Sequence, residues 1–524
     1  MNFYSINKKL KSIHNFLNMI LQEWYSKNNI LFRNLFIFFK SDTVKGKENG
    51  ILLVQLVKDN ENTIKLAAAS KVLANKHNLL ISLHDVNIFW SKKHEIITRI
   101  LYRKNKNLYL SFGESVLFSN NKKFYNQKFI KNELYNIIKN LNNNPENLLV
   151  LNFENILVGD LIYDTYLRFY HQPTILNIDK NVIKVIEKAL NLYYSFKFLI
   201  TKINLKILVN TYTSYIHHGI TLRTCLQKNI DVYTVDPIFQ KIQINYPFHN
   251  INHTRFNSNF NLNNEQLELA KKNLESRFLG EIDTATIYMR ASAYNNNFCN
   301  PNLIEQFKIR TRNVVIFMHD FYDSPHMFRS LQFPDMYQFL KQTLAALIDL
   351  KSTSIFIKLH PNAVEGSNDI AINLINSYNS PHFYILDTNI SNLNIINIKP
   401  DLICTARGTI GIEMAYHGIP TVALYDNIYT NFNFVHTCYN LKDFFLILRG
   451  DLSTQIDFNK TNILSFYYQA YINEMSSDNY QLYQILSTFS YKYDVNSDNY
   501  LEKVLSLKEE IFNDKFLNYF KEKL

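Results

Sequence analysis

The sequence predicts an α/β protein in which two Rossmann-like domains face each other across a cleft, with further helices at both ends of the chain. Short apolar runs, long enough for buried strands, alternate with helical patterns over residues 51–235 and again over residues 314–425. The segment between these blocks, residues 236–312, mostly lacks such alternation. A chain of 524 residues is also longer than one ordinary domain of roughly 100–200 residues. These observations together predict two separate α/β domains.

The chain begins with a predicted helical segment, residues 1–45, whose pattern differs from that of the two α/β blocks. Its apolar residues recur at spacings of three and four, the period of one helix face, and they are Ile6, Leu10, Ile13, Leu17, Ile20 and Trp24. Lys8, Lys9 and Lys11 lie near its start. This pattern fits a helix lying in a membrane interface, and it also fits a helix packed on the body of the protein.

The first α/β domain is predicted over residues 46–262. Its apolar runs predict strands at 51–57, 79–83, 108–112, 148–153, 206–210 and 231–235. Helical patterns lie between most of them, at 63–76, 127–141, 179–196 and 215–227. Asp179 precedes the third helix and is a suitable N-cap. Residues 236–262, rich in Asn, His and aromatic residues, predict a long surface loop.

The second α/β domain is predicted over residues 313–450, after a linker at 263–312. The linker starts with a helix at 264–278 that ends at Gly280, a common stop residue. The second domain alternates strands at 314–318, 354–359, 401–405 and 421–425 with helices at 335–350, 369–378 and 409–417. The remaining tail, residues 451–524, has a mostly helical pattern.

The composition limits the partners and the compartment of the protein. A net charge of +11 favours polyanionic partners such as nucleotides or an anionic membrane surface, although a solvated lysine-rich surface explains it as well. No apolar stretch approaches the ~20 residues of a membrane span, and no cleavable leader is visible. We therefore expect a cytoplasmic protein, soluble or peripheral on the inner face of the membrane. Four widely spaced cysteines, without a CxxC pair or zinc-ligand spacing, predict free thiols in a reducing cytosol: Cys225, Cys299, Cys404 and Cys438.

The most informative segment reads DLICTARGTIGIEMAYHGIPTVALY. A buried strand ends at Thr405, a short turn contains Arg407 and Gly408, and a helix comes next. Ligands bind beyond the carboxyl ends of parallel strands, and the first N–H groups of a helix attract anions. Gly408 permits close backbone approach, Thr409 can cap the helix or bond a phosphate, and Glu413 can accept bonds from ribose hydroxyls. An ordinary strand–turn–helix explains the same spacing.

Two further strand ends carry polar residues. The segment IFIKLHPN places Lys358, His360 and Pro361 at the end of a strand, because proline cannot continue a central strand. His360 can there neutralise a leaving phosphate. The segment MHDFYDSP brings His319 and Asp320 to another strand end. A single histidine is more often structural, but the pairing of the IFIKLHPN segment with the Thr405 turn, on adjacent strands, favours a site.

The first domain contributes a separate group of candidates. In VGDLIYDTYLR, Asp160, Asp164 and Arg168 follow one another at spacings of four, on one helical face. They can form a catalytic base with its orienting group, a clamp for an acceptor, or an internal salt-bridge ladder. The segment YIHHGITLR, just after a strand end, supplies three candidates for acceptor contact: His217, His218 and Arg223.

The motifs HDFYDSPH, LQFPDMYQFL, FIKLHPN and TARGTIGIEMAYHGIP resemble bacterial capsule and surface-polysaccharide biosynthesis proteins. They are similar to the wider group of GT-B transferases with an HP motif, which includes capsule Kdo transferases and bacterial sialyl- and polysialyltransferases. VGDLIYDTYLR looks like the same capsule family. The resemblance implies that His360 contacts the nucleotide phosphate, and that phosphate and sugar meet the turn and helix that hold Thr405, Gly408, Thr409 and Glu413. Of the family's Gly-Asp-Asn-Pro-His-like stretch, only Asp426 and Asn427 are kept.

The resemblance implies a GT-B-like fold and a glycosyltransferase. No cluster of metal ligands is visible in the sequence, so we expect metal-independent chemistry without a cofactor. The donor of such a transferase would be a nucleotide-activated sugar, for example a CMP-linked sugar such as CMP-Kdo, and its acceptor a glycan or a lipid-linked glycan. Asp160 or Asp164 would deprotonate the acceptor, while His360 and Arg407 would stabilise the departing phosphate. Peripheral contact with the inner membrane or with other polysaccharide-assembly enzymes is expected, and nucleic acid is not. Two alternatives stay open: a polyol-phosphate transferase of the CDP-glycerol type, and a non-catalytic polysaccharide- or nucleic-acid-binding protein.

Overall fold

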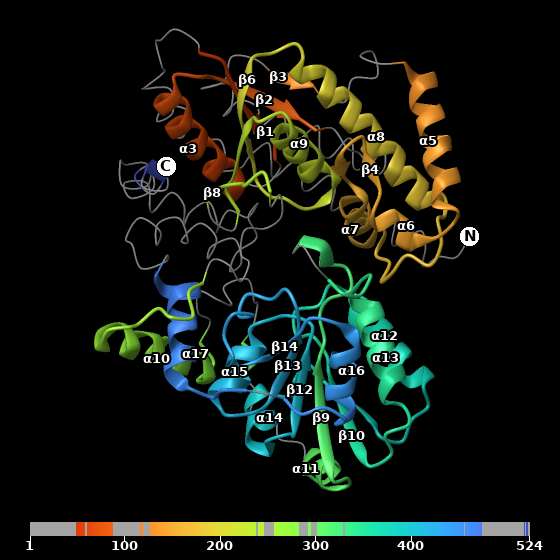
Figure 1. Cartoon of the computed structure of the whole chain (residues 1–524), viewed down its shortest axis with the longest axis vertical. Helices are drawn as coiled ribbons and strands as arrows, with labels where there is room; N and C mark the ends of the chain where they lie inside the picture. The colour runs from red at the N-terminus through yellow and green to blue at the C-terminus, as the bar shows by residue number, and fades with distance from the viewer. Residues whose placement is uncertain are drawn as a thin grey trace, which may run out of the picture. The chain divides into compact units, whose positions relative to one another are not determined.

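The computed structural model describes most of the chain between residues 49 and 473 (Figure 1). The described residues are 49–57, 60–86, 116–118, 126–236, 239–245, 256–281, 292–294, 301–327, 331–454, 456–473, 518, 520, 521 and 524. The chain forms two compact units, one of Met1–Asp85, Ser91–Leu117 and Asp478–Leu524, the other of Val86–Trp90 and Phe118–Ser477. The predicted helix within 1–45, the predicted strand at 108–112 and nearly all of the tail after 473 lie outside the described residues. The predicted domain boundaries stay predictions.

The first unit contains a βαβ element, as the sequence predicts. Strands β1 (Ile51–Gln55) and β2 (Leu80–Asp85) pair in parallel and are joined by helix α3 (Asn60–His77). Leu52, Leu53 and Val54 are fully buried, because strands of a parallel sheet are covered on both faces. A short strand, β3 (Val116–Phe118), lies where the two units divide the chain.

The second unit starts with helices around two parallel strands. Strands β6 (Leu205–Asn210) and β7 (Asp231–Thr234) are parallel and joined by α9 (Tyr215–Gln227), and the two-residue β8 (Gln240–Lys241) pairs antiparallel with β7. Three further helices pack with α9 into one apolar core, namely α5 (Gln127–Leu141), α7 (Gly159–Tyr170) and α8 (Lys180–Ile200). Asp179 caps α8 as predicted, accepting bonds from the N–H groups of Asn181 and Val182.

The predicted strand at 148–153 is wrong. The chain there forms the short helix α6 (Pro145–Leu149) and then a hairpin of β4 (Asn152–Phe153) and β5 (Ile156–Leu157). The Asn144 side chain accepts a bond from the Glu146 N–H, and Pro145 occupies the first helical position. These two local signals for a helix start override the apolar run that comes after them.

The C-terminal part of the second unit contains a six-stranded parallel sheet (Figure 1). Its strands are β9 (Arg312–Phe317), β10 (Thr353–Lys358), β11 (Phe383–Leu386), β12 (Leu402–Thr405), β13 (Thr421–Leu424) and β14 (His436–Cys438). They lie in the order β11-β10-β9-β12-β13-β14 and pair in parallel throughout. In chain order this is 3-2-1-4-5-6, the strand order of Rossmann folds that bind dinucleotides. The direction of winding reverses between β9 and β12.

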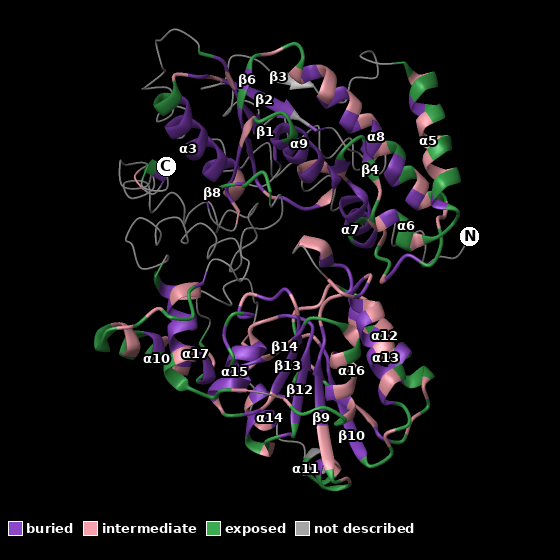
Figure 2. Ribbon diagram, viewed as in Figure 1, coloured by how far each residue is buried: buried purple, intermediate pink, exposed green. Residues whose placement is uncertain are grey.

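Helices cover both faces of this sheet. Val315 and Phe317 of β9 belong to one apolar cluster, whereas Val314 and Ile316 belong to the other, because successive side chains of a strand point to opposite faces. The first cluster packs against α10 (Asn264–Phe278), α11 (Pro301–Lys308), α14 (Asn392–Ile398), α15 (Ile410–Tyr416), α17 (Lys460–Tyr468) and the π-helix η3 (Gln469–Asn473). The second packs against α12 (Met336–Leu347), α13 (Ser367–Ser377) and α16 (Leu441–Arg449). Figure 2 shows buried residues along the central strands, so the predicted α/β class with Rossmann-like strands is confirmed.

Some elements of this part were not predicted. Strand β11 is only partly buried over three of its four residues, and β14 has three residues, so neither gives a clear apolar run. Helix α11, within the predicted linker, and the two-residue β8, within the predicted surface loop, were not predicted either. Among the helices that the structure describes, none is both long and apolar enough to cross a bilayer.

Candidate functional site

Three strands of the C-terminal sheet end at one level. Phe317 at the end of β9 is in register with Lys358 of β10 on one side and with Thr405 of β12 on the other. The expectation that the strands of Lys358 and Thr405 are adjacent is wrong, because β9 lies between them. The polar residues that follow these strands therefore meet at the carboxyl edge, at the point where the winding reverses. Open α/β sheets bind their ligands in the crevice at this point.

A pocket of about 150 Å³ that is open to solvent lies at this edge. Most of the predicted donor-binding residues line it, namely His319, Lys358, His360, Pro361, Thr405, Arg407, Gly408, Thr409 and Glu413. Three residues that were not predicted line it as well, namely Arg277, Tyr294 and Asn392. The structure thus brings together residues from three strand ends, and adds partners from α10, α14 and the segment before α11.

His319 follows β9 and supports the turn after β12. Its Nε2 accepts a bond from the Arg407 backbone N–H at 3.1 Å and lies 3.2 Å from Thr405 Oγ1, which donates to the Arg407 carbonyl at 2.6 Å. Burial, with the nearby His360 and Arg407, lowers the pKa of His319 to about 3. The ring is therefore neutral at pH 7, and the proton that it carries is on Nδ1, because Nε2 acts as an acceptor.

Gly408 has a backbone conformation that suits glycine. Its φ is +124°, outside the range that side chains adopt without strain, and a Cβ there would lie 3.6 Å from His319 Cε1. This glycine keeps the turn beside His319 open to a ligand.

Lys358 and His360 supply the other side of the pocket. The Lys358 ammonium donates to the carbonyls of Asp387 at 2.7 Å and Thr388 at 3.2 Å. Burial lowers its pKa to about 8, so it still carries a positive charge at pH 7. Nδ1 of His360 accepts the Asn362 N–H at 3.2 Å, which places the ring proton on Nε2, and burial lowers its pKa against the opposing effect of nearby carboxylates. An ammonium and a neutral N–H donor thus lie at one strand end.

Glu413 is held by two residues from outside the predicted motif. The Arg277 guanidinium, through Nη2, lies 2.6 Å from Glu413 Oε1 and donates to Thr409 Oγ1 at 2.8 Å. Tyr294 donates its hydroxyl proton to the other carboxylate oxygen. The predicted capping of α15 by the Thr409 side chain is wrong, because this hydroxyl bonds Arg277 and makes no cap bond. Glu413 is therefore a fixed, charge-neutralised part of the pocket wall.

Asp426 and Asn427 are buried beside β13 and are not among the residues that line the pocket. The Asn427 side chain donates to the Leu424 carbonyl at 2.8 Å and accepts the Tyr429 N–H at 3.1 Å. It thus holds the turn after β13. The predicted contact of these two residues with a donor gains no support from this placement.

Asp160 and Arg223 form a buried bidentate ion pair between α7 and α9, with N–O distances of 2.7 and 2.6 Å. Arg223 also donates to the Leu157 carbonyl at 2.7 Å. Asp160, a predicted base, and Arg223, predicted to contact the acceptor, therefore neutralise each other. Of the three interpretations of VGDLIYDTYLR, this is nearest to the salt-bridge ladder, but the cation is Arg223, whereas Arg168 is exposed.

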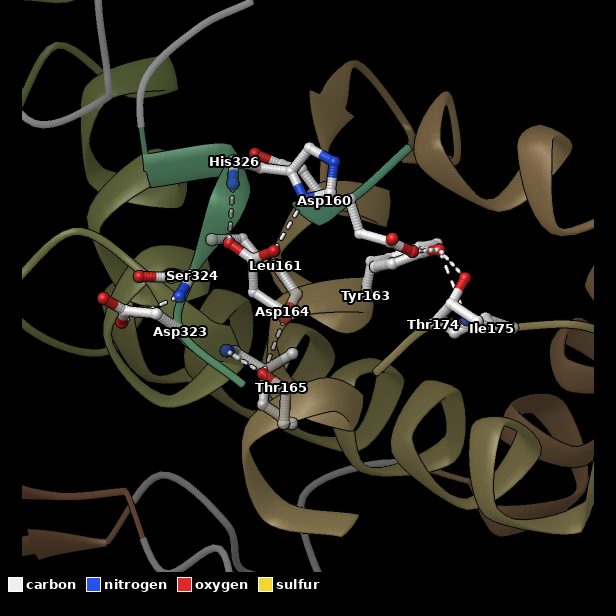
Figure 3. Close-up of polar contacts among 12 residues, drawn as sticks. Asp160, Leu161, Tyr163, Asp164, Thr165, Thr174, Ile175, Asp323, Ser324 and His326 are labelled. Carbon is white, nitrogen blue, oxygen red and sulfur yellow. Dashed lines mark hydrogen bonds and ion pairs between the residues drawn. The ribbon is translucent and has the colours of Figure 1, made fainter. Parts of the chain in front are cut away.

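Asp164 is paired instead with His326, on the 3-10 turn η2 (Pro325–Met327). Figure 3 shows bonds from both the ring and the backbone nitrogen of His326 to this carboxylate. Nδ1 lies 2.6 Å from Oδ1, and the backbone N–H lies 3.3 Å from Oδ2. Burial raises the pKa of Asp164 to about 6, against the lowering effect of His326. His326 was not among the predicted site residues, although it is the last residue of HDFYDSPH.

His217 and His218 lie at the start of α9, beyond the end of β6. His218 is half-buried, with Nδ1 3.2 Å from Thr211 Oγ1, and desolvation of its ring lowers its pKa well below the usual value. The His217 ring stacks on Tyr215, with centroids 5.7 Å apart. Their predicted contact with an acceptor stays a prediction.

Comparison with known proteins finds some similar solved structures but no family. No protein-family model matches the chain, and no curated protein matches it. One similar solved structure is the KpsC beta Kdo 2,4 transferase of Thermosulfurimonas dismutans, with 10% identity, a TM-score of 0.30, and coverage of 50% of this chain and 78% of that chain. A glycosyltransferase from Rickettsia africae has 12% identity and a TM-score of 0.27, over 84% of this chain and 99% of that one.

The UDP-GlcNAc 2-epimerase of Methanocaldococcus jannaschii is also similar, with 14% identity and a TM-score of 0.23, over 79% of this chain and 97% of that one. At these TM-scores the similarities carry no argument about the site. Among the residues that the structure describes, no three His, Cys, Asp or Glu side chains group as metal ligands would, and metal independence stays a prediction.

Proposed function

We propose that the chain is a glycosyltransferase whose C-terminal sheet binds the phosphate of a nucleotide-activated sugar. One observation carries the proposal: His319, His360 and the Arg407–Gly408 turn follow three strands that end in register at the reversal of a 3-2-1-4-5-6 sheet. This is the position at which Rossmann-like sheets bind nucleotides. Polar residues at this edge, around a pocket with room for a ligand, support a binding role over a purely structural one.

The donors in the pocket suit a phosphate that leaves with its charge. Lys358 and Arg407 are cations at the ends of β10 and β12, while the neutral rings of His319 and His360 each carry one N–H. When the bond between the sugar and the phosphate breaks, negative charge grows on the phosphate oxygen. N–H donors that are already held in place stabilise that growing charge more than they stabilise the intact nucleotide sugar.

The opposite wall suits the hydroxyls of a ribose or a sugar. Glu413 accepts one bond from Arg277 and one from Tyr294, and each carboxylate oxygen can accept another. Arg277 keeps the carboxylate charge balanced, so that the wall offers acceptors without repelling the phosphate. We infer that Glu413 accepts bonds from these hydroxyls.

The motif resemblance supports a narrower proposal. A CMP-linked sugar such as CMP-Kdo would be the donor, a glycan or lipid-linked glycan the acceptor, and a capsule or surface polysaccharide the product. We further propose that the reaction needs no metal or cofactor, and that the protein works at the cytoplasmic face of the membrane.

A nucleotide screen tests the proposal. The melting temperature is measured with CMP, UDP, GDP and their sugar conjugates, and release of the best nucleotide is then assayed with a glycan acceptor. A ligand at about 100 times its Kd stabilises the protein by roughly 2.7 kcal/mol. His360→Ala should weaken this binding about tenfold, the effect of losing one hydrogen bond of ~1.4 kcal/mol.

His382→Gln is the matched control. His382 is also a buried histidine of this sheet, but it precedes β11 and so lies at the opposite, amino edge. The variant should bind the nucleotide as the wild type does. The proposal fails if no nucleotide stabilises the protein, or if both variants bind alike. Transfer of a polyol phosphate to the acceptor, instead of a sugar, would establish the CDP-glycerol alternative.

A further inference from the structure

His326 and Asp164 come from distant parts of the sequence and are joined by two hydrogen bonds. The ring donates from Nδ1 to Oδ1 at 2.6 Å, and the backbone N–H of the same residue bonds Oδ2 at 3.3 Å (Figure 3). Two bonds to one carboxylate determine both the position and the rotation of the ring. Because Nδ1 holds the proton, the neutral ring presents its lone pair on Nε2.

Nε2 of His326 is buried and has no hydrogen-bond partner among the described residues. Buried polar atoms are normally bonded, so each exception requires an explanation. His382 shows the usual case: its Nδ1 lies 2.9 Å from Ser380 Oγ, and its Nε2 lies 3.2 Å from the Leu347 carbonyl. At His326 an oriented acceptor atom is left without a donor, which is the arrangement of a base that awaits a hydroxyl.

Two other carboxylates near the His326–Asp164 pair, Asp160 and Asp335, already have ionic or hydrogen-bond partners. Asp160 is neutralised by Arg223. Asp335 caps α12 by accepting the Gln338 N–H at 2.7 Å, and it accepts the Tyr163 hydroxyl at 2.6 Å. Neither has the freedom to take a proton from a substrate. Asp164, for its part, has a side chain only 2% exposed and reaches other groups through His326.

His326 lies on the segment that leads away from the nucleotide pocket, whereas Asp164 lies on α7. That segment begins at His319, which lines the pocket, and reaches His326 seven residues later. Within it, the charge of Asp323 acts both on His360 of the pocket and on Tyr215 of α9. The segment therefore spans the space between the phosphate-binding edge and helices α7 and α9.

We propose that His326 is the general base of the transfer and that Asp164 is its positioning residue. This inference rests on the proposed glycosyl transfer. Nε2 takes the proton of the acceptor hydroxyl, while the acceptor oxygen bonds to the anomeric carbon of the donor sugar. The bond from that carbon to the phosphate oxygen breaks, and its electron pair leaves with the phosphate. Asp164 stays ionised, holds Nδ1–H and stabilises the imidazolium. Nε2 is buried in the free protein, so the side chains that cover it move when the acceptor binds, and the bond from the acceptor hydroxyl to Nε2 forms only in that complex.

The proposal makes the rate depend on pH. Burial alone would lower the pKa of His326, but the Asp164 carboxylate, with smaller effects of Asp160 and Asp335, raises it above the ordinary 6.5. Tyr163 packs its ring edge-on against the imidazole, with centroids 5.3 Å apart. The base form is lost as pH falls through this raised pKa, so kcat should climb with pH from a low value at pH 6 to a plateau on the alkaline side.

The test uses His326→Asn, because the amide nitrogen of asparagine can keep the bond to Asp164 while Nε2 is removed. Nucleotide release from the best-binding nucleotide sugar is measured from pH 5.5 to 9, with a glycan acceptor and with water alone. We expect kcat to fall about 100-fold or more, and the remaining kcat should no longer rise with pH between 6 and the alkaline plateau. The stabilisation by nucleotide should be unchanged. Asp164→Asn should reduce kcat similarly, and added imidazole should restore activity to His326→Ala.

The control variant His382→Gln should keep both the wild-type kcat and its rise with pH. Wild-type kcat in His326→Asn would refute the base role. The base role would also be refuted if kcat fell by the same factor at every pH, still rose with pH as in the wild type, and was not restored by imidazole. That result marks a purely structural residue. If the wild type binds no nucleotide, or binds one and releases none from any donor, the proposed function itself fails. These results separate the two proposals.

Discussion

Arg277 on α10 and Glu413 on α15 form a buried ion pair in the wall of the pocket at the carboxyl edge of the C-terminal sheet, with Nη2 and Oε1 2.6 Å apart. Both side chains are at most 5% exposed. The same guanidinium bonds Thr409 at the start of α15, so one arginine connects the helix before the sheet to the turn after β12. Loss of this pair should therefore affect both stability and ligand binding.

Removing one partner of this pair should be costly. Glu413→Gln leaves the Arg277 charge buried without its counter-charge, so we expect a loss of about 3–5 kcal/mol in the free energy of unfolding. Urea unfolding followed by circular dichroism measures this. The exposed pair of Arg449 and Asp349 is the control, and Asp349→Asn should leave the unfolding midpoint nearly unchanged. Equal effects of the two substitutions would contradict the structural role of Arg277.

The turn at Gly408 should tolerate no side chain. Gly408→Ala forces alanine to a φ of +124°, which costs about 1–3 kcal/mol of unfolding free energy, and it should abolish the nucleotide-induced rise in melting temperature. Gly418→Ala is the matched control, with a φ of +71° and no heavy atom within 4 Å of the added Cβ. It should cost some stability yet leave nucleotide binding intact. If the Gly408 variant binds normally, the turn is not the phosphate site.

Nucleotide affinity should weaken above pH 8. The pKa of Lys358 is about 8 in the free protein, and a bound phosphate favours its charged form. Binding then takes up a proton on the alkaline side, so Kd should rise by about tenfold per pH unit there. Isothermal titration calorimetry in buffers of different ionisation enthalpy measures the proton uptake directly. In Lys358→Met both the uptake and this pH dependence should be absent, and their persistence would assign them to another group.

The neutral ring of His319 should make the fold sensitive to acid. Its pKa is about 3 in the folded protein and 6.5 when unperturbed, so between these values the unfolded chain binds one more proton. Stability is then lost as pH falls from 6.5 toward 3, by up to about 1.4 kcal/mol per pH unit from this residue. The free energy of unfolding, measured with urea at pH 4, 5 and 6, should change less steeply with pH in His319→Asn than in the wild type. Thr405→Val removes the neighbouring hydroxyl but no titrating group, so it should lower stability without changing the slope.

The local sequence pattern predicted most strands and helices, but it did not predict which elements lie next to one another in the fold. The helices α5, α9 and α10 begin and end where the sequence predicts, because apolar periodicity and capping residues act within a few positions. The strand predicted at 148–153 failed when a local start signal, Asn144–Pro145, favoured a helix. Periodicity alone cannot separate a short buried strand from a short helix.

Sequence alone was enough to locate the residues that end the strands of the second block: Lys358 before His360 and Pro361, and Thr405 before Arg407 and Gly408. Proline, glycine and apolar runs decide such points locally, through backbone geometry. The folded chain was needed to show that β9 lies between these strands, that Glu413 pairs with Arg277, and that Asp160 and Asp164 face Arg223 and His326. Those partners are brought together by parallel pairing and packing across long stretches of chain. No short-range pattern encodes such contacts, because their energy depends on burial that exists only in the folded protein.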